Sequence, residues 1–287
     1  DVTGIIQIWK CNFLTLEKND IGNPSYMAPI LINFANQNNS FVKIEDNNLF
    51  NFSSKAISIS NAYNGVVSNN SFYFTVPLNK NGVSIQVIAS LLNFSLTISE
   101  NWIGGTGPHC SGNYMEIVNT STSLSGKLDF SGIYCSGIYN QDIVVYNNIK
   151  NIKLTTGYGA GIFNAIGTYI GAREINYNQI GDVNDPNSII VSLPNSSNSY
   201  TCNGIYFYNP QVGSNIKVKI IGNSIRGISC NSQTTMKMNI SGINLDIKHY
   251  YTETTVDSNT IKGINCLARG AAFGIQCLKD DISGGST

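Results

Sequence analysis

Side chains able to carry out acid–base or metal chemistry are few in this chain and are scattered along it. It has only two histidines, His109 and His249, and neither has grouped partners for a metal site or a histidine-based triad. The adjacent acidic pairs Glu45–Asp46 and Asp280–Asp281 do not have the separation that places carboxyl groups on two sides of a bound sugar. We therefore predict no catalytic residue, no metal ligand and no cofactor.

A lyase-type site would need a base beside a group that neutralises charge. Lys217, Lys219 and Arg226, together with Tyr206 and Tyr208, are the residues that could converge into one. The alternating pattern around the two lysines favours a solvated strand face instead.

Aromatic residues follow several Gly-Ile pairs and suggest a binding surface. In a strand, the residue after a core-facing Ile points to the opposite face. The residues placed outward in this way are Tyr134, Tyr139, Phe163, Tyr206 and Tyr208. Their rings could stack on a neutral glycan or on a partner protein. The alternative is an aromatic ladder that only stabilises the sheet.

A repeated phrase indicates which elements would position these residues. It consists of an apolar residue, two variable residues, Asn, one variable residue and a second apolar residue. Its eight copies are anchored at Asn12, Asn47, Asn70, Asn101, Asn147, Asn178, Asn223 and Asn259. The intervals between them are of the length, roughly 20 to 50 residues, that is typical of solenoids, propellers and arrays.

The last four copies are the most regular. Each adds an outer Ile or Val five residues after Asn, at Ile152, Val183, Ile228 and Ile264. Gly-Ile pairs alternate with them, at Gly137-Ile138, Gly161-Ile162, Gly204-Ile205, Gly242-Ile243 and Gly274-Ile275. We predict looser repeats over residues 1–130 and regular repeats over residues 131–278.

Short β-branched runs bounded by Gly, Asn, Asp and Ser predict strands and turns in each repeat. Examples are residues 142–146, 188–192 and 216–220. Strands this short bury a core only when successive coils stack. Asn147, Asn178, Asn223 and Asn259 are then predicted to form a structural ladder of amide hydrogen bonds along the stack. Gly before Ile would mark a corner with a tight turn or a positive φ.

The phrases IIGNSIRGISC (220–230), VDSNTIKGINC (256–266), VVYNNIKNI (144–152) and INYNQIGDV (175–183) resemble those of the Asn- and Ile-rich β-helix proteins that bacteria secrete or display. The resemblance implies an all-β fold, a right-handed parallel β-helix, as a single domain over residues 1–287. A propeller would need steadier spacing. Proteins of this type include adhesins, carbohydrate-active enzymes and phage tail proteins, so the resemblance implies an extracellular or cell-surface location.

Composition narrows the possible partners. The 17 acidic and 17 basic residues cancel and form no basic stripe, so nucleic-acid binding is not expected. No apolar run is long enough to predict a membrane span. The chain opens on Gly4-Ile5 and closes on a short polar tail, so we expect a section of a longer chain whose other parts cover the ends of the solenoid.

Two of the seven cysteines, Cys230 and Cys266, follow their anchor Asn at the same distance and should stack. A buried column of free thiols is favoured over a disulfide between them.

These features leave three hypotheses. The first, which we favour, is a non-catalytic repeat scaffold or adhesin-like section that binds a glycan or a surface protein through a lateral sheet face. The second is a polysaccharide-degrading enzyme of the lyase type. The third is a phage tail section that binds a receptor.

Overall fold

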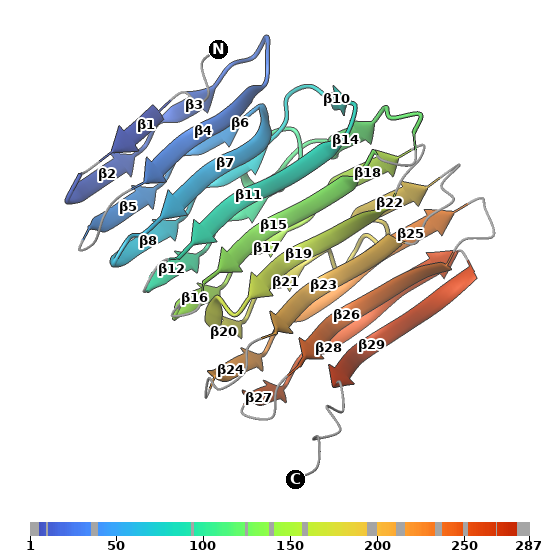
Figure 1. Cartoon of the computed structure of the whole chain (residues 1–287). Coiled ribbons are helices and arrows are strands. Elements are labelled where there is room, and N and C mark those ends of the chain that lie inside the picture. The colour runs from blue at the N-terminus through green and yellow to red at the C-terminus, as the bar shows by residue number, and fades with distance from the viewer. Residues whose placement is uncertain are drawn as a thin grey trace.

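The chain forms a parallel β-helix, in which every coil lays strands into three long sheets (Figure 1). The computed structural model describes residues 6–9, 11–35, 40–92, 95–123, 126–137, 141–156, 160–193, 200–210, 216–232, 237–248, 252–267 and 269–279. All strand pairs within the three sheets are parallel. The predicted all-β solenoid fold is confirmed.

The first sheet, sheet A, has the longest strands. In spatial order they are β1 (Ile6–Trp9), β4 (Ala28–Ala35), β7 (Phe52–Ser60), β11 (Val83–Leu91), β15 (Leu128–Ser136), β19 (Gly161–Tyr169), β23 (Tyr200–Asn209), β26 (Lys237–Ile247) and β29 (Arg269–Lys279). The chain thus advances by one strand of this sheet in each coil.

Sheet B follows sheet A in each coil. Its strands are β2 (Phe13–Glu17), β5 (Phe41–Glu45), β8 (Asn64–Ser68), β12 (Leu96–Ser99), β16 (Asp142–Val145), β20 (Ala172–Asn176), β24 (Ile216–Ile221) and β27 (Thr252–Asp257).

Sheet C closes the coil and consists of two runs of short strands. The run next to sheet B comprises β3 (Asp20–Gly22), β6 (Asn48–Phe50), β9 (Ser71–Tyr73), β13 (Trp102–Ile103), β17 (Asn148–Ile149) and β21 (Gln179–Ile180). The other run comprises β10 (Leu78–Lys80), β14 (Met115–Asn119), β18 (Ile152–Thr156) and β22 (Ile189–Leu193). The strands β25 (Ser224–Ser232) and β28 (Thr260–Leu267) continue both.

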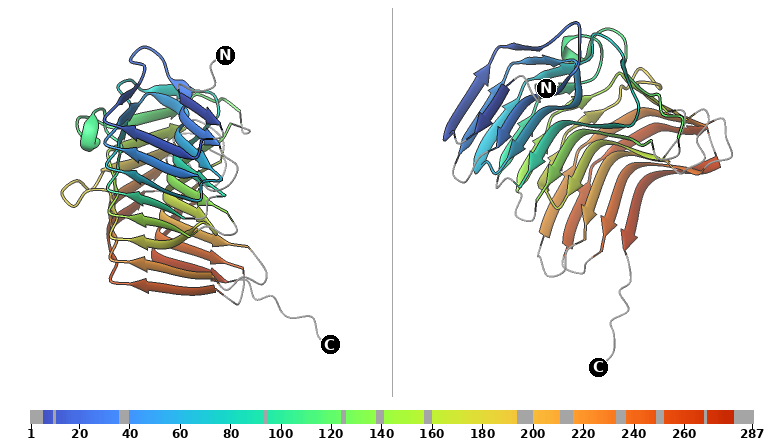
Figure 2. Two further views of the ribbon diagram at one scale, coloured as in Figure 1. Left: turned by 90° about the vertical axis from the view of Figure 1, so that its left-hand side faces the viewer. Right: turned by 45° about the horizontal axis from the view of Figure 1, so that its top comes forward.

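The coils stack as layers, and a short loop with a helical turn is among those that project from their side (Figure 2). That loop follows β13 and contains the only helical turn among the described residues, the 3-10 turn η1 (Pro108–Cys110).

Apolar side chains from the three sheets fill the interior of each coil. One column of isoleucines runs through the strands of sheet A in exact register, and its members are Ile32, Ile57, Ile88, Ile133, Ile166, Ile205 and Ile243. All seven are fully buried. Burying one such side chain contributes about 1.5–3 kcal/mol, so the stacked columns supply the main driving force for folding.

An asparagine row lines the corner between sheets B and C. Each Asn donates from its backbone N and its Nδ2 to the Oδ1 of the Asn in the next coil, at 2.9–3.1 Å. The row runs without a break through Asn19, Asn47, Asn70, Asn101, Asn147, Asn178, Asn223 and Asn259. The amides therefore satisfy one another where the strand ladders of the two sheets are interrupted.

The residue before each of these asparagines is in the left-handed region. The φ values lie between 54° and 68° at Lys18, Asp46, Asn69, Glu100, Tyr146, Tyr177, Gly222 and Ser258. A non-glycine residue rarely adopts this conformation, and the hydrogen bonds of the Asn row offset its cost.

Two sequence-based expectations about the repeat were wrong in detail. The first anchor is Asn19 and not Asn12, because Asn19 donates to Asn47 through N and Nδ2. The row is also as continuous in the first half of the chain as in the second.

Gly before Ile marks a corner at Gly137, which follows β15 and has a φ of 154°, but it does not do so throughout the series. Gly204-Ile205 lies in the middle of β23, and Gly204 is outside the set of positive-φ glycines. Two consecutive residues of β23, Gly204 and Ile205, are both buried, and we call this point the bend of the strand. A Cβ on Gly204 would lie 2.6 Å from the Gly242 carbonyl oxygen. The register places Gly132-Ile133 and Ala165-Ile166 at this bend, so Gly137-Ile138 and Gly161-Ile162 do not belong to the series.

Cys230 and Cys266 are directly in register, and no disulfide joins them. The nearest sulfur to Cys230 Sγ belongs to Cys202 on sheet A, at 2.8 Å across the coil interior. Burial raises the pKa of the Cys230 thiol well above its ordinary value.

Candidate functional site

The outward residue that follows the core Ile forms one row across the strands of sheet A. In β15, β19 and β23 these residues are Tyr134, Gly167 and Tyr206, which pair directly in register. Strands in a sheet are about 4.8 Å apart, so the two tyrosines lie roughly 10 Å from each other with no side chain between them. Gly167 thus leaves a gap between two aromatic side chains.

A second outward row lies two residues further along the strands. Tyr169 and Tyr208 are in register, and their rings meet edge to face with centroids 5.1 Å apart. The rings of Tyr206 and Tyr208 are nearly parallel at 6.3 Å. Four tyrosines therefore surround Gly167 on three sides.

The gap opens into a hollow of about 240 Å³ on the outer face of sheet A. We call this hollow the tyrosine slot. Its lining comprises Ser84, Ile85, Gln86, Asp129, Phe130, Ser131, Tyr134, Ile162, Asn164, Gly167, Thr168, Tyr169, Tyr206 and Tyr208. The volume is near the lower limit of small-ligand sites and suits one ring at a time.

Side-chain amides form the floor of the slot. Asn203 Nδ2 donates to Asn164 Oδ1 at 2.8 Å, and Asn244 Nδ2 donates to Asn203 Oδ1 at 3.2 Å. The Asn164 amide nitrogen lies 3.3 Å from the position of a Cβ on Gly167, and Ser131 Oγ lies 3.6 Å from it. The gap between the tyrosines therefore ends on a polar floor.

Few charges are near the slot. Burial raises the pKa of the Asp129 carboxyl, while nearby Lys127 opposes that shift. Burial, together with Asp246, raises the pKa of the Tyr206 hydroxyl to about 12, so this hydroxyl is neutral at physiological pH. Asp246 forms an ion pair with Lys248, Nζ to Oδ1 at 3.3 Å. The slot thus offers ring faces, amides and hydroxyls with one partly desolvated carboxyl group.

Phe163 was predicted to be outward, and this is wrong. Its side chain is fully buried and stacks on Phe130 with ring centroids 5.5 Å apart, whereas Ile162 is 44% exposed. The expectation failed because Gly161-Ile162 lies at the start of β19 and out of register with the Gly-Ile bend. Tyr139 lies outside the described residues. Tyr134, Tyr206 and Tyr208 lie together in the slot.

The alternative cluster of Lys217, Lys219, Arg226, Tyr206 and Tyr208 does not converge. The tyrosines lie on sheet A, the lysines on β24 of sheet B and the arginine on β25 of sheet C. Lys217 instead pairs with Glu253 at 2.8 Å. Over the ranges that the structure describes, no group of three or more His, Cys, Asp or Glu side chains is arranged to hold a metal ion.

The slot residues missed from the sequence include Gly167, Tyr169 and Asn164. The Gly-Ile pair that would have indicated them is altered in this coil, because Ala165 stands before Ile166 where other coils have Gly. Aligning Ile166 with Ile133 and Ile205 would have placed Gly167 between the two tyrosines.

The chain was also compared with known proteins, and no family model, curated protein or solved structure matches it. The fold and the slot define its class, a parallel β-helix with a lateral aromatic site. Among the described residues, no helix has the length and apolar character needed to cross a lipid bilayer.

Proposed function

We propose that the protein is a non-catalytic, extracellular β-helix scaffold that binds a glycan through the outer face of sheet A. The supporting observation is the register of Tyr134, Gly167 and Tyr206, which leaves a ring-sized gap between two aromatic side chains. An aromatic row that served only to stabilise the sheet would gain cross-strand contacts from a third ring at this position. The missing ring at Gly167 therefore argues against a purely stabilising role for the tyrosines.

The chemistry of the lining supports a sugar as the ligand. The apolar C–H faces of a pyranose ring pack on aromatic faces, as other apolar groups do. Its hydroxyl groups need donors and acceptors, which Asn164 and Ser131 supply at the floor. A site built in this way binds without needing a reactive group.

Glycan-array binding with the intact chain tests the proposal. We expect a subset of neutral glycans to bind, and the paired variant Tyr134→Ala/Tyr206→Ala to weaken that binding at least about tenfold. Tyr26→Ala is the control, because it removes an exposed tyrosine ring far along the chain from the slot.

Circular dichroism and thermal melting show whether each variant is folded. Lost binding with an unchanged β spectrum supports the site. Undiminished binding by the folded double variant, or no glycan bound by the wild-type chain, would contradict it.

A further inference from the structure

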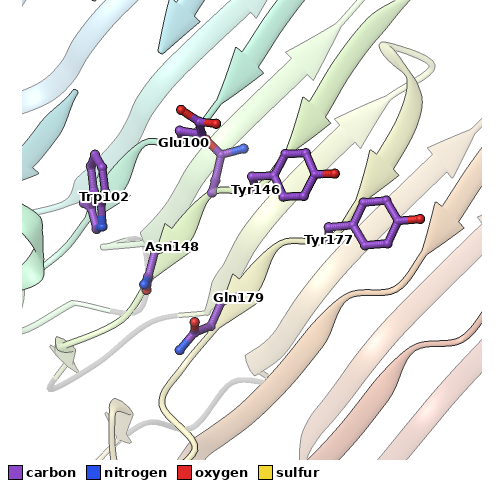
Figure 3. A pocket seen from close by; sticks show the side chains of 7 residues that line it. Glu100, Trp102, Tyr146, Asn148, Tyr177 and Gln179 are labelled. Carbon is purple, nitrogen blue, oxygen red and sulfur yellow. The ribbon is translucent and has the colours of Figure 1, made fainter. Parts of the chain in front are cut away.

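A second recess lies on a different surface, outside the asparagine row at the corner of sheets B and C (Figure 3). Glu100, Tyr146 and Tyr177 precede the row asparagines of three successive coils, and Trp102, Asn148 and Gln179 follow them. These six side chains border a hollow of about 300 Å³, with Asn147 also in its lining. We call it the corner groove.

Two tyrosines form an aromatic platform in this groove. The rings of Tyr146 and Tyr177 are nearly parallel, at 10°, with centroids 5.4 Å apart. They are 57% and 52% exposed, which is unusual for a pair of large aromatic side chains. The left-handed backbone at both positions turns the side chains outward, away from the core (Figure 3).

Gly222 in the next coil helps to place the platform. A Cβ on this glycine would lie 2.5 Å from Cδ1 and Cε1 of Tyr177. The ring of Tyr177 therefore occupies the space over Gly222, and a larger residue there would displace it.

The groove continues along the axis toward the N-terminal coils. Trp102 contacts the ring of His109 edge-on, with centroids 4.4 Å apart, and the His109 backbone N donates to Ser71 Oγ at 3.1 Å. Beyond this contact is a hollow of about 260 Å³, lined by Asp46, Asn47, Asn48, Asn69, Ser71, Pro108 and His109. The two hollows thus follow the asparagine row over five coils, from that of Asn47 to that of Asn178.

We propose that the corner groove binds a linear, neutral polysaccharide lengthwise. Successive coils present equivalent positions about 4.8 Å apart, close to the length of one sugar unit in an extended chain. One sugar face would lie on the tyrosine platform, and the hydroxyl groups of the same chain would reach the amides of Asn148 and Gln179 and the carboxylate of Glu100. This proposal is independent of the tyrosine slot.

The charges in the lining exclude anionic polysaccharides. The residues that line the two hollows include the carboxylates of Asp46 and Glu100 and no Lys or Arg. A polyanion such as a uronic-acid polymer would be repelled, because nothing in the lining neutralises it. The carboxylates instead accept hydrogen bonds from sugar hydroxyls, and such charge-assisted bonds are the stronger kind.

Calorimetric titration with three soluble hexasaccharides of equal length tests the proposal: a β-linked glucose hexamer, a galacturonate hexamer and a glucosamine hexamer. We expect the neutral hexamer to bind more tightly than the neutral dimer and than the galacturonate hexamer. Tighter binding of the glucosamine hexamer would assign the groove to a cationic chain instead. The variant Tyr146→Asn/Tyr177→Asn should weaken its binding at least about tenfold. Asn suits the left-handed backbone at these positions, as Asn69 already shows, so this variant keeps the corner intact.

Gly167→Tyr, which fills the tyrosine slot, and Tyr26→Ala serve as controls and should bind the neutral hexamer as the wild type does. The inference is overturned if the neutral hexamer does not bind, if either charged hexamer binds as well or better, or if the Asn variant retains full affinity. Loss of hexamer binding in Gly167→Tyr alone would assign the ligand to the slot and also overturn the corner site.

Discussion

At the residue scale, the buried asparagines stabilise a corner that strand pairing leaves open. Asn147 shows the full set of interactions: its Nδ2 donates to the Ile98 and Val145 carbonyls and to Asn178 Oδ1, and its own Oδ1 accepts from Asn101. Only the amide side chains of Asn and Gln carry both an NH₂ donor and a carbonyl acceptor without a charge, and Asn is the shorter of the two.

Asn147→Ala should therefore lower the free energy of unfolding by about 3 kcal/mol or more, because several buried partners lose their hydrogen bonds at once. Urea denaturation measures the effect. Asn113→Ala, in an exposed loop, should change stability by less than about 0.5 kcal/mol. Equal effects of the two substitutions would show that the row contributes little.

Cys202 and Cys230 are a second residue-scale feature. Their sulfurs are 2.8 Å apart, and a disulfide needs an approach to about 2.05 Å. Refolding with oxidised glutathione should link them, with the thiols giving up two electrons and two protons to the oxidant. The bond should raise stability by about 3 kcal/mol.

Peptide mass mapping under non-reducing conditions detects this link. Cys202→Ser should abolish it, and Cys266→Ser should leave it unchanged. A link between Cys230 and Cys266 instead would contradict the arrangement of the coil interior.

At the scale of elements, a buried carboxyl group joins sheet A to sheet B. Asp142, at the start of β16, accepts hydrogen bonds from the Ser90 hydroxyl on β11, the Leu96 backbone N on β12 and the Cys135 thiol on β15. Burial is the main cause that raises its pKa to about 7, and the three hydrogen bonds oppose the shift.

This shift predicts how stability depends on pH. Between pH 3.8 and about 7 the unfolded chain loses the Asp142 proton while the folded chain retains it, so stability falls as pH rises through this window. The loss should approach about 4 kcal/mol above pH 7. Melting temperatures at pH 4 and pH 8 should therefore differ more for the wild type than for Asp142→Asn. An identical pH response in both proteins would contradict this role.

The elements also show how much of the fold could be predicted from the sequence. The stacked coils follow from the spacing of Asn and Ile, because each turn of the solenoid repeats the same local chemistry. The bend in sheet A could not be located in the same way. The position at the bend requires only an inward-facing residue that the facing sheet can accommodate. It is therefore occupied by residues of different types, which are Leu31, Ala56, Val87, Gly132, Ala165 and Gly204.

The candidate site was predictable only in part for the same reason. Tyr134 and Tyr206 follow recognisable Gly-Ile pairs. Gly167 follows Ala165-Ile166, which does not match the Gly-Ile motif, so the motif could not identify it. The corner groove left no motif at all, because its residues precede and follow the asparagines without a shared type. Only the register between coils brings Tyr146 beside Tyr177.

At the scale of the whole molecule, the asparagine row and the core columns form a repetitive support, and the two proposed binding sites lie outside it. The tyrosine slot occurs where one coil lacks a side chain between the tyrosines of its two neighbours. The corner groove occurs where the residues around the asparagine row become aromatic. Both depend on differences between coils in a structure whose interior is repetitive, so the surface can vary without disturbing the fold.

The most direct test of the proposed function is the glycan affinity of Gly167→Tyr. This glycine has no positive φ, and the atom nearest to an added Cβ is Asn164 Nδ2 at 3.3 Å, so a tyrosine needs a shift of this amide by a few tenths of an ångström and then fills the slot. Thr97→Tyr, which adds the same ring to the outer face of sheet B, is the control. We predict that Gly167→Tyr melts at or above the wild-type temperature and loses binding to those array glycans whose binding Tyr134→Ala/Tyr206→Ala also weakens. Retained affinity in the folded variant would contradict the account and leave the tyrosines as a stabilising ladder.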